Sequence, residues 1–294
     1  MKIVFIGCVD FSAAMLGMLL DHPEAELVGL VTREKSNANS DFQDLHPLAQ
    51  QANVPIFTSN NNNQQEMISW LRARQADVIY CLGWSFLLSA EVLSIPPLGV
   101  VGYHPAALPQ NRGRHPIIWA LTLGLKQTAS SFFLMDEAAD SGDILSQVAI
   151  GIDPSDDAGS LYQKLIDAAL PQLHSLTTAL AAGRITAIPQ DHKQANYWRK
   201  RSASDGRIDW RMSATVITNL VRALTRPYPG AHCEHNGKDI KIWRAQPLHT
   251  APDNIEPGKV LKVSDGHILI KCGEGAVELI EHTFNPLPLE GSYL

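Results

Sequence analysis

The sequence predicts an α/β protein built on a mostly parallel sheet, with a smaller β-rich domain after it. In the first half, short apolar runs such as Lys2–Gly7 and Asp77–Leu82 alternate with stretches in which apolar residues have helical spacing. Unbroken apolar strands separated by helices are typical of a parallel sheet covered on both faces. After about residue 205, short strands joined by glycine-containing turns replace this alternation. A chain of 294 residues has room for two unequal domains.

The elements of the first part follow from apolar spacing and from turn signals. Met67, Trp70 and Leu71 share one face of a helix, and Pro116 opens another. The resulting order is that of a Rossmann-like sheet. Gly7 lies in a turn with one glycine where a dinucleotide-binding fingerprint needs three, which argues against NAD. We expect strands at 2–7, 26–32, 77–82, 100–103, 130–135 and 144–152, and helices at 11–20, 42–51, 63–75, 89–93, 115–123 and 157–182.

A polar, helix-poor stretch at 186–207 leads into the second part of the chain. There, Asn236-Gly237 is a strong hairpin signal between two apolar runs. A succession of short strands predicts a small β-barrel or a meander, and we take a small, OB-like β-barrel as the expected fold of this part. We place the domains at 1–205 and 206–294, with a helix at 214–224 and strands at 232–235, 239–243, 260–263, 267–271 and 276–280.

The composition excludes several classes of protein. Lys and Arg number 24 and Asp and Glu 30, so the net charge of −6 disfavours a protein that coats itself in nucleic acid. The longest apolar runs have the length of strands, well short of a membrane span. The amino terminus lacks the long apolar region of a signal peptide, which favours a cytoplasmic protein. The four cysteines are far apart without a CxxC pair, so neither a metal site nor a disulfide framework is expected.

Two polar segments follow strands of the expected sheet, where ligands bind in open α/β folds. The first is the loop from Tyr103 to Arg114, which includes His104 and two prolines. The second is the acidic turn from Met135 to Ile144, which contains Asp140. A carboxylate beside an imidazole sets its tautomer and supports general acid–base catalysis. Taken singly, such a histidine is more often structural, and the acidic turn is equally well a hydrogen-bonded turn or a cation site.

Together, the two segments carry a family resemblance. The first segment contains the stretch HPAALPQNRGRHPIIWAL, which begins at His104. The motif DSGDI follows, with Asp140 36 residues after His104. This combination resembles the folate-dependent formyltransferases. These act on methionyl-tRNA, glycinamide ribonucleotide or nucleotide-linked amino sugars. The segments GRIDW, VRALTRPYPG, KIWRA and PGKV resemble the linker and C-terminal barrel of the methionyl-tRNA and sugar enzymes, so nearly the whole chain is covered. The resemblance implies the formyltransferase fold.

The resemblance also implies the site. His104 and Asp140 are the expected catalytic pair, 10-formyltetrahydrofolate is the expected cofactor, and no metal is expected. In this chemistry an amine attacks the formyl carbon, a charged imidazole stabilises the oxygen and a carboxylate takes the proton. The pterin needs a mostly apolar slot with a few backbone donors and acceptors. The residues expected to form that slot are Leu82, Gly83, Trp84, Ser85, Phe86, Leu87, Leu88, Ala106, Ala107, Leu108, Pro109, Ala138 and Ala139.

One position departs from the family pattern. The family usually has Asn two residues before the histidine, where its amide donates to the formyl oxygen, and this chain has Gly102. Loss of one such donor costs about 10²–10³ in rate in other enzymes. Asn111 in the same loop is a candidate surrogate. The alternatives are that water supplies the donor or that the enzyme is slow.

The acceptor is expected to be a nucleotide-linked amino sugar. Family members that act on tRNA carry a basic loop after the second strand, whereas 33–46 here has two positive and three negative side chains, which would attract RNA poorly. The segments SDFQDL and NYWRKRSASDGRIDWRMS resemble those of sugar N-formyltransferases. A nucleotide needs an aromatic face for its base and cations for its diphosphate. The residues expected to supply them are Arg33, Tyr197, Trp198, Arg199 and Lys200. A solvated linker explains the last four equally well.

Two other functions stay open on the sequence alone. One is a methionyl-tRNA formyltransferase whose RNA contacts come from the C-terminal domain. The other is a folate- or nucleotide-binding module that has lost activity at Gly102. A homodimer, without nucleic acid or membrane partners, is compatible with the composition.

Overall fold

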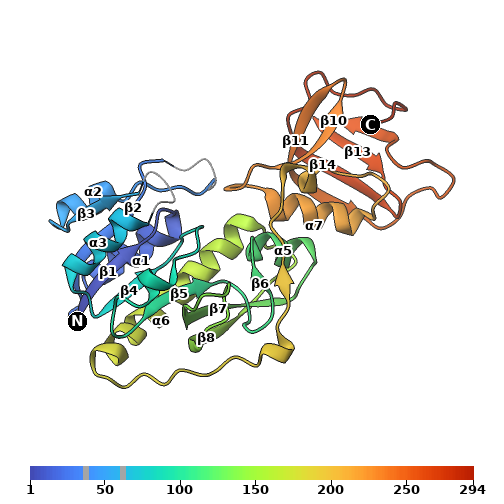
Figure 1. The fold of residues 1–294 in the computed structure, drawn as a ribbon. Coiled ribbons are helices and arrows are strands. Elements are labelled where there is room, and N and C mark those ends of the chain that lie inside the picture. Colours follow the sequence, from blue (N-terminus) through green and yellow to red (C-terminus); the bar gives the residue numbers. More distant parts are fainter. Residues whose placement is uncertain (36–39, 60–63) are drawn as a thin grey trace. The chain divides into compact units, whose positions relative to one another are not determined.

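The computed structural model describes residues 1–35, 40–59 and 64–294 of the chain (Figure 1). Contacts between residues divide it into two compact units. The first contains Met1–Pro116, Thr128–Ile150 and Gln163–Trp198, and the second contains Ile117–Gln127, Gly151–Tyr162 and Arg199–Leu294. The boundary at residue 205 stays a prediction.

The first unit is built on a seven-stranded sheet whose order is β3-β2-β1-β4-β5-β7-β8. The pairs from β3 to β5 are parallel, and β7 runs antiparallel to β5. The expectation of a mostly parallel sheet is therefore confirmed. The strands are β1 (Lys2–Ile6), β2 (Glu26–Thr32), β3 (Ile56–Thr58), β4 (Val78–Cys81), β5 (Val100–His104), β7 (Gln127–Leu134) and β8 (Ile144–Gly151).

Helices cover both faces of this sheet, as the alternation along β4 shows. Ile79 and Cys81 belong to one buried cluster with Met67 and Leu71. Tyr80, between them, points to the opposite face, where its hydroxyl lies 3.0 Å from Thr177 Oγ1. Helix α3 therefore covers one face and α6 the other, which explains the unbroken apolar strands. The helices are α1 (Asp10–Leu20), α2 (His46–Gln51), α3 (Gln65–Arg74), α4 (Ala90–Leu93) and α6 (Ala158–Ala181).

Helix α2 is shorter than the sequence pattern predicts. The expected helix at 42–51 begins at His46, because Phe42 instead forms an antiparallel bridge with Val9. Asp44 Oδ1 accepts a hydrogen bond of 3.0 Å from the backbone N–H of His46 and so satisfies a donor at the first turn. Phe42 is thus an apolar residue that precedes the helix and does not belong to it.

The second unit contains a five-stranded antiparallel sheet in the order β10-β11-β14-β13-β12. Asn236 and Gly237 join β10 to β11 with φ angles of 52° and 72°, as a two-residue hairpin turn requires. Closure of this sheet into a barrel stays a prediction. The elements are α5 (Pro116–Thr122), α7 (Ala214–Leu224), β10 (Ala231–His235), β11 (Lys238–Leu248), β12 (Val260–Ser264), β13 (His267–Lys271) and β14 (Ala276–His282).

A two-stranded ribbon in the first unit has no counterpart among the expected elements. Strand β6 (Arg112–Gly113) pairs in parallel with β9 (Tyr197–Trp198). Two short 3₁₀ turns, His192–Gln194 and Ala203–Gly206, lie in the stretch around β9. The polar stretch after α6 is therefore ordered by pairing with the loop that follows β5.

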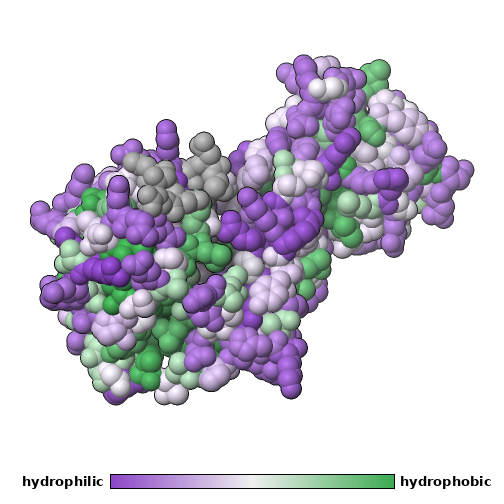
Figure 2. Space-filling model, in the orientation of Figure 1, coloured by the Kyte–Doolittle hydropathy of each residue, from purple (hydrophilic) through white to green (hydrophobic). Residues whose placement is uncertain are grey.

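Hydrophilic side chains dominate the visible surface of each unit (Figure 2). Among the described residues, no helix combines the length and the apolar character needed to cross a membrane.

Candidate active site

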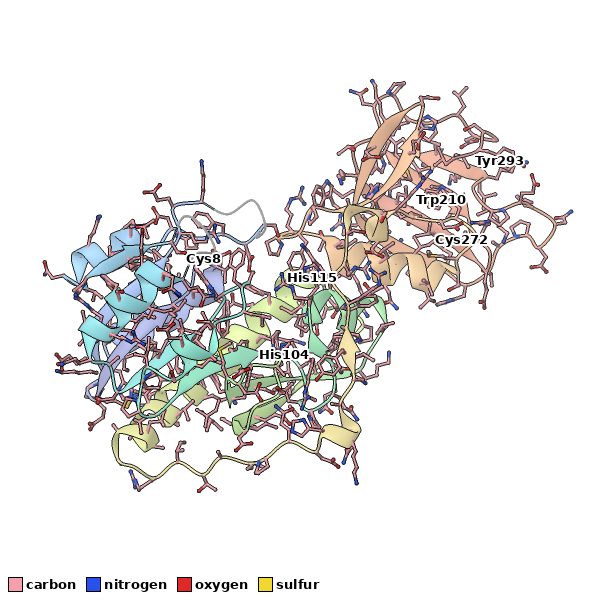
Figure 3. The ribbon with its side chains drawn as sticks, in the orientation of Figure 1. Cys8, His104, His115, Trp210, Cys272 and Tyr293 are labelled. Carbon is pink, nitrogen blue, oxygen red and sulfur yellow. The ribbon has the colours of Figure 1, made fainter. Side chains whose placement is uncertain are left out.

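His104 is the last residue of β5, and its side chain is almost completely buried at 4 % exposure (Figure 3). Its Nε2 donates a hydrogen bond of 2.7 Å to the backbone carbonyl of Asn111. A carbonyl oxygen only accepts, so the proton is on Nε2 in the neutral ring and Nδ1 is left as the reactive nitrogen. The sequence-predicted histidine is thus held in one orientation by its own loop.

Asp140 faces that nitrogen. Its Oδ2 lies 3.5 Å from His104 Nδ1 and accepts a hydrogen bond of 2.8 Å from the backbone N–H of Gly113. The residue adopts a left-handed conformation with φ of 55°, which Asp tolerates better than most residues. Strained backbone of this kind concentrates at functional sites. The structure therefore brings together the two residues expected to form the catalytic pair.

The route by which Asp140 reaches His104 differs from the simplest expectation. Strand β7 is antiparallel to β5, and Leu134 at its end pairs with Val101 rather than with His104. The turn after β7 therefore starts beside the beginning of β5 and must return along the strand. Gly142 permits this return, because a Cβ at that position would overlap the Leu134 carbonyl oxygen.

Two polar side chains, buried Ser131 and exposed Gln147, hold the loop after His104 by hydrogen bonds to its backbone. Ser131 Oγ donates to the Ala106 carbonyl at 2.7 Å, and Gln147 Nε2 donates to the Leu108 carbonyl at 3.1 Å. Ala106 and Leu108 are buried, whereas Ala107 and Pro109 are half-buried. This part of the expected pterin slot is therefore rigid, with two of its carbonyl groups already hydrogen-bonded.

The segment Leu82–Leu88 after β4 divides into buried and accessible residues. Leu82 and Leu88 are in the core, and Ser12 Oγ donates to the Leu82 carbonyl at 2.6 Å. Trp84 and Phe86 are half-buried with their rings 5.7 Å apart, and Leu87 is 66 % exposed. Gly83 and Ser85 are also half-buried, as is Ala139 in the acidic turn, while Ala138 is exposed. The side chains available to a ligand are therefore aromatic rather than those of Leu82 and Leu88.

The space beside Gly102 is filled. A Cβ at this position would lie 2.8 Å from Met135 Cγ and 2.9 Å from Phe133 Cζ. Phe133 is buried in the same sheet. The side-chain amide that the family usually has here would collide with these two residues. The packing around Gly102 therefore leaves no space for it.

A buried arginine beside the pair was missed by the sequence analysis. Arg112 is 1 % exposed, and its guanidinium donates to Gln190 Oε1 at 2.6 Å and to the Tyr197 hydroxyl at 2.9 Å. Gln190 in turn donates to the carbonyl groups of Asp140 and Gly142, at 3.0 Å and 2.6 Å. A lone charged residue in a polar loop carries no periodic signal, so only the tertiary structure identifies it.

The residues expected to bind the acceptor belong to different parts of the structure. Arg33 lies with its guanidinium 4.7 Å from the centre of the Phe86 ring and 5.9 Å from that of Trp84. Tyr197 and Trp198 form β9 in the first unit, whereas Arg199 and Lys200 belong to the second. Arg33 is thus associated with the expected pterin segment.

Arg199 is already committed to a carboxylate. Its guanidinium makes two hydrogen bonds to Asp205, at 2.9 Å and 2.5 Å. These hydrogen bonds hold the pKa of the Asp205 carboxyl well below its usual range. A diphosphate would have to compete with this pair for the cation.

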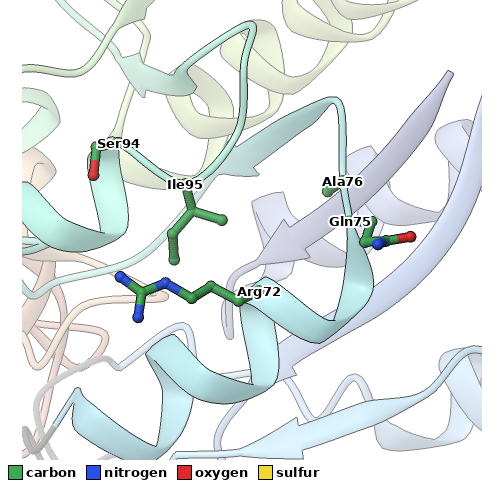
Figure 4. Close-up of a pocket in the computed structure, with 5 residues that line it drawn as sticks. All are labelled: Arg72, Gln75, Ala76, Ser94 and Ile95. Carbon is green, nitrogen blue, oxygen red and sulfur yellow. The ribbon is translucent and has the colours of Figure 1, made fainter.

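A small hollow on the first unit contains none of the expected residues. It has a volume of about 240 Å³ and is lined by Arg72, Gln75, Ala76, Ser94 and Ile95 (Figure 4). Ligand sites for drug-sized molecules measure roughly 300–1,000 Å³. Among the residues that the structure describes, no group of three or more His, Cys, Asp or Glu is arranged to hold a metal ion.

The fold is an α/β architecture with a mostly parallel sheet, and His104 and Asp140 lie 3.5 Å apart in it. Two family models match the sequence: "Formyl transferase" at residues 1–176 and "Formyl transferase, C-terminal domain" at residues 200–288. The chain belongs to the formyl transferase family and is a transferase. The resemblance inferred from the sequence is confirmed.

Three solved structures with the same fold are distant in sequence. HypX from Aquifex aeolicus in complex with tetrahydrofolic acid is 17 % identical with a TM-score of 0.66, and the match covers 95 % of this chain and 43 % of HypX. An N-formyltransferase from Helicobacter canadensis, with folinic acid and dTDP-3-aminofucose, is 13 % identical with a TM-score of 0.71, covering 95 % and 98 %. Methionyl-tRNA formyltransferase from Clostridium thermocellum is 17 % identical with a TM-score of 0.62, covering 96 % and 99 %. The chain thus spans less than half of HypX.

Proposed function

We propose that this enzyme transfers the formyl group of 10-formyltetrahydrofolate to the primary amine of a nucleotide-linked amino-dideoxy sugar in the cytoplasm. The observation that carries the proposal is the pairing of buried His104 with Asp140 at 3.5 Å. An amine nucleophile must lose a proton as it attacks, and the oxygen of the formyl group gains negative charge. A carboxylate and an imidazole in one site serve these two needs.

The described residues fit a folate. A pteridine is flat and mostly apolar at its faces, and Trp84 and Phe86 present two half-buried rings after β4. On the acidic turn, the Ala138 N–H already donates to Asp136 Oδ1 at 3.1 Å and its carbonyl accepts from Ser141 Oγ at 3.1 Å, so this turn offers the folate the second lone pair of that carbonyl and the half-buried residue Ala139. When bound, the folate would supply an activated formyl group, and its nitrogen would leave with the proton that the acceptor amine gives up.

Each member of the pair has a distinct task. Asp140 accepts the proton that the amine loses, and the Gly113 N–H fixes its Oδ2 during that transfer. The Asn111 carbonyl holds the Nε2 proton of His104, and a proton taken up at Nδ1 places positive charge beside the developing oxyanion. The Nδ1–Oδ2 separation of 3.5 Å exceeds that of a charged hydrogen bond, so we expect the pair to tighten around substrate. The side-chain amide of Asn111 remains our candidate for the donor that Gly102 does not supply.

The charge of the chain supports a sugar nucleotide over tRNA. Nucleic-acid affinity depends on cations that neutralise phosphates, and this protein has a net charge of −6. Arg199 is paired with Asp205 and Arg33 stacks on Phe86, so neither extends freely as an RNA-binding side chain would. The Helicobacter canadensis structure, which contains a dTDP-linked amino sugar, matches 95 % of this chain and the methionyl-tRNA formyltransferase matches 96 %, so the choice of acceptor rests on charge and not on the fold.

The test is a transfer assay with the full chain. Purified protein is incubated with 10-formyltetrahydrofolate and a panel of nucleotide-linked amino sugars, and product is detected by mass as addition of one formyl group. We expect turnover with at least one member and none with its N-acetylated form. A salt-sensitive gel shift and formylation with initiator methionyl-tRNA would replace the sugar assignment by the tRNA one. Donor binding without transfer to any amine would contradict both.

A further inference from the structure

The stretch of chain between the two family-model matches lies directly against the catalytic loops. The models cover residues 1–176 and 200–288, so 177–199 belongs to neither. Within it, Gln190, His192, Asn196 and Tyr197 all contact the loop that follows β5 or the acidic turn. All four lie in the first unit with His104 and Asp140. A segment that resembles a linker in sequence is therefore part of the site's framework.

Gln190 uses its whole side-chain amide for this purpose. It is 5 % exposed, and its Nε2 donates to the carbonyl groups of Asp140 at 3.0 Å and Gly142 at 2.6 Å. Its Oε1 accepts from Arg112 Nε at 3.1 Å and Nη2 at 2.6 Å. An amide has two donor protons and two acceptor lone pairs, and all four are occupied. Gln190 thus fixes the backbone on both sides of Ser141, starting at the catalytic carboxylate's own residue.

Arg112 extends the same connection to the histidine loop. Its buried guanidinium donates to Gln190, to the Tyr197 hydroxyl and to His192 Nδ1, the last at 3.3 Å. Each of these acceptors is neutral, and a buried cation is tolerated only when its donors are satisfied. The residues on either side of it are Asn111, whose carbonyl holds His104, and Gly113, whose N–H holds Asp140. The arginine therefore ties the segment to the centre of the site.

Asn196 holds the other end of the loop. Its Oδ1 accepts a hydrogen bond of 2.6 Å from the backbone N–H of Asn111. Asn111 has a left-handed φ of 62°, and its carbonyl accepts the proton from His104 Nε2 at 2.7 Å. One short segment thus holds both the loop that orients the imidazole and the turn that carries the carboxylate.

We propose that residues 190–197 act as a positioning clamp for catalysis, with Gln190 setting Asp140 and Asn196 setting the Asn111–His104 contact. The proposal rests on the proposed function of the His104–Asp140 pair. Misplacement of a reacting group by about 1 Å costs roughly 10²-fold in rate. Loss of the clamp lowers kcat and leaves donor binding nearly intact, because Gln190 and Asn196 hold backbone groups of Asp140, Gly142 and Asn111 and are not among the residues expected to line the pterin slot.

Three variants separate positioning from mere packing. Gln190→Met removes every hydrogen bond, while Gln190→Glu keeps an acceptor for Arg112 but loses both donors to the turn. The control is Gln172→Met, since Gln172 is a similarly buried amide at 8 % exposure that donates to the Ser130 carbonyl and to Ser146. We expect both Gln190 variants to lose about 10- to 100-fold in kcat with donor KM within about threefold. Gln172→Met should stay within about threefold of wild type.

Two results would overturn the clamp. If Gln190→Glu retains wild-type kcat, the glutamine serves only as a partner for Arg112. If Gln172→Met loses as much kcat as Gln190→Met, general packing explains the effect.

A readout without turnover keeps this test distinct from that of the proposed function. In protein labelled with ¹⁵N-histidine, the His104 Nε2 proton bonded to Asn111 should exchange slowly with water. We expect Asn196→Ala to speed that exchange markedly and Gln172→Met to leave it unchanged. An unchanged exchange rate in Asn196→Ala would contradict the clamp even if no acceptor were ever found. Faster exchange in Asn196→Ala, together with a wild-type protein that transfers no formyl group, would uphold the clamp and count against the proposed function.

Discussion

Gly102 is the position where one added methyl group most directly tests the packing beside His104. A Cβ there would lie 2.8 Å from Met135 Cγ and between 2.9 and 3.0 Å from two atoms of the Phe133 ring. Carbon atoms in contact prefer about 3.5–4.0 Å, so the overlap is roughly 0.5–1.2 Å. Phe133 is buried, so a shift of its ring disturbs the residues packed around it. Overpacking of this degree costs about 1–3 kcal/mol, so Gly102→Ala should lower the stability of the first unit by about that amount.

The assay is thermal unfolding with a matched glycine control. At about 2–4 °C per kcal/mol, Gly102→Ala should lower Tm by roughly 2–12 °C, and Gly102→Asn by more. Gly17 is in helix α1, and a Cβ at that position would have nothing within 4 Å, so Gly17→Ala should leave Tm unchanged or raise it slightly. A Tm for Gly102→Ala equal to wild type would refute the packing argument. So would a faster Gly102→Asn enzyme, since the added amide would then have found space.

Three further outcomes are expected. Asp140→Asn keeps the left-handed backbone but removes the proton acceptor, so kcat should fall at least about 10²-fold in a steady-state transfer assay; Asp143→Asn, in the same turn, is the control and should change kcat less than about threefold. Trp84→Ala should raise the KM for the formyl donor about tenfold or more, because ring stacking is worth about 1–3 kcal/mol, and an unchanged KM would exclude this ring from the slot. A thiol reagent at pH 8 should not react with the native protein and should find four thiols after denaturation, because burial raises the thiol pKa to about 11 for Cys8 and Cys272 and about 12 for Cys81 and Cys233; a native thiol that reacts at pH 8 would contradict the buried assignment.

Much of the fold was predictable because the signals are local. The apolar run at 26–32 and the helix at 214–224 have the expected bounds, Ser89 caps α4, and Asn236-Gly237 makes its hairpin. Each depends on residues within a few positions of one another. Strand β3 was missed because Ile56–Thr58 is only three residues long.

The proximity of His104 and Asp140 was predictable and their surroundings were not, while their catalytic role stays a prediction. His104 and Asp140 stand in a family motif, so the sequence identifies both. Strands β6 and β9 contain two residues each and lie 85 positions apart in the sequence. Strands this short leave no periodic pattern in the sequence. Arg112 has the composition of a surface residue, and its burial depends on acceptors that only the folded chain supplies. Tyr197 stays a predicted substrate contact, and the hydrogen bond that its hydroxyl accepts from this arginine was not predictable.

A double-mutant cycle on the two facing side chains tests the central claim most directly. His104→Ala, Asp140→Asn and the double variant are compared with wild type in single-turnover formyl transfer. When two groups act as a unit, removal of one already abolishes the contribution of the other. The double variant should therefore react no more slowly than about the slower single variant. Rate losses that multiply, or a single variant that keeps wild-type turnover, would show that the imidazole and the carboxylate do not work as a unit.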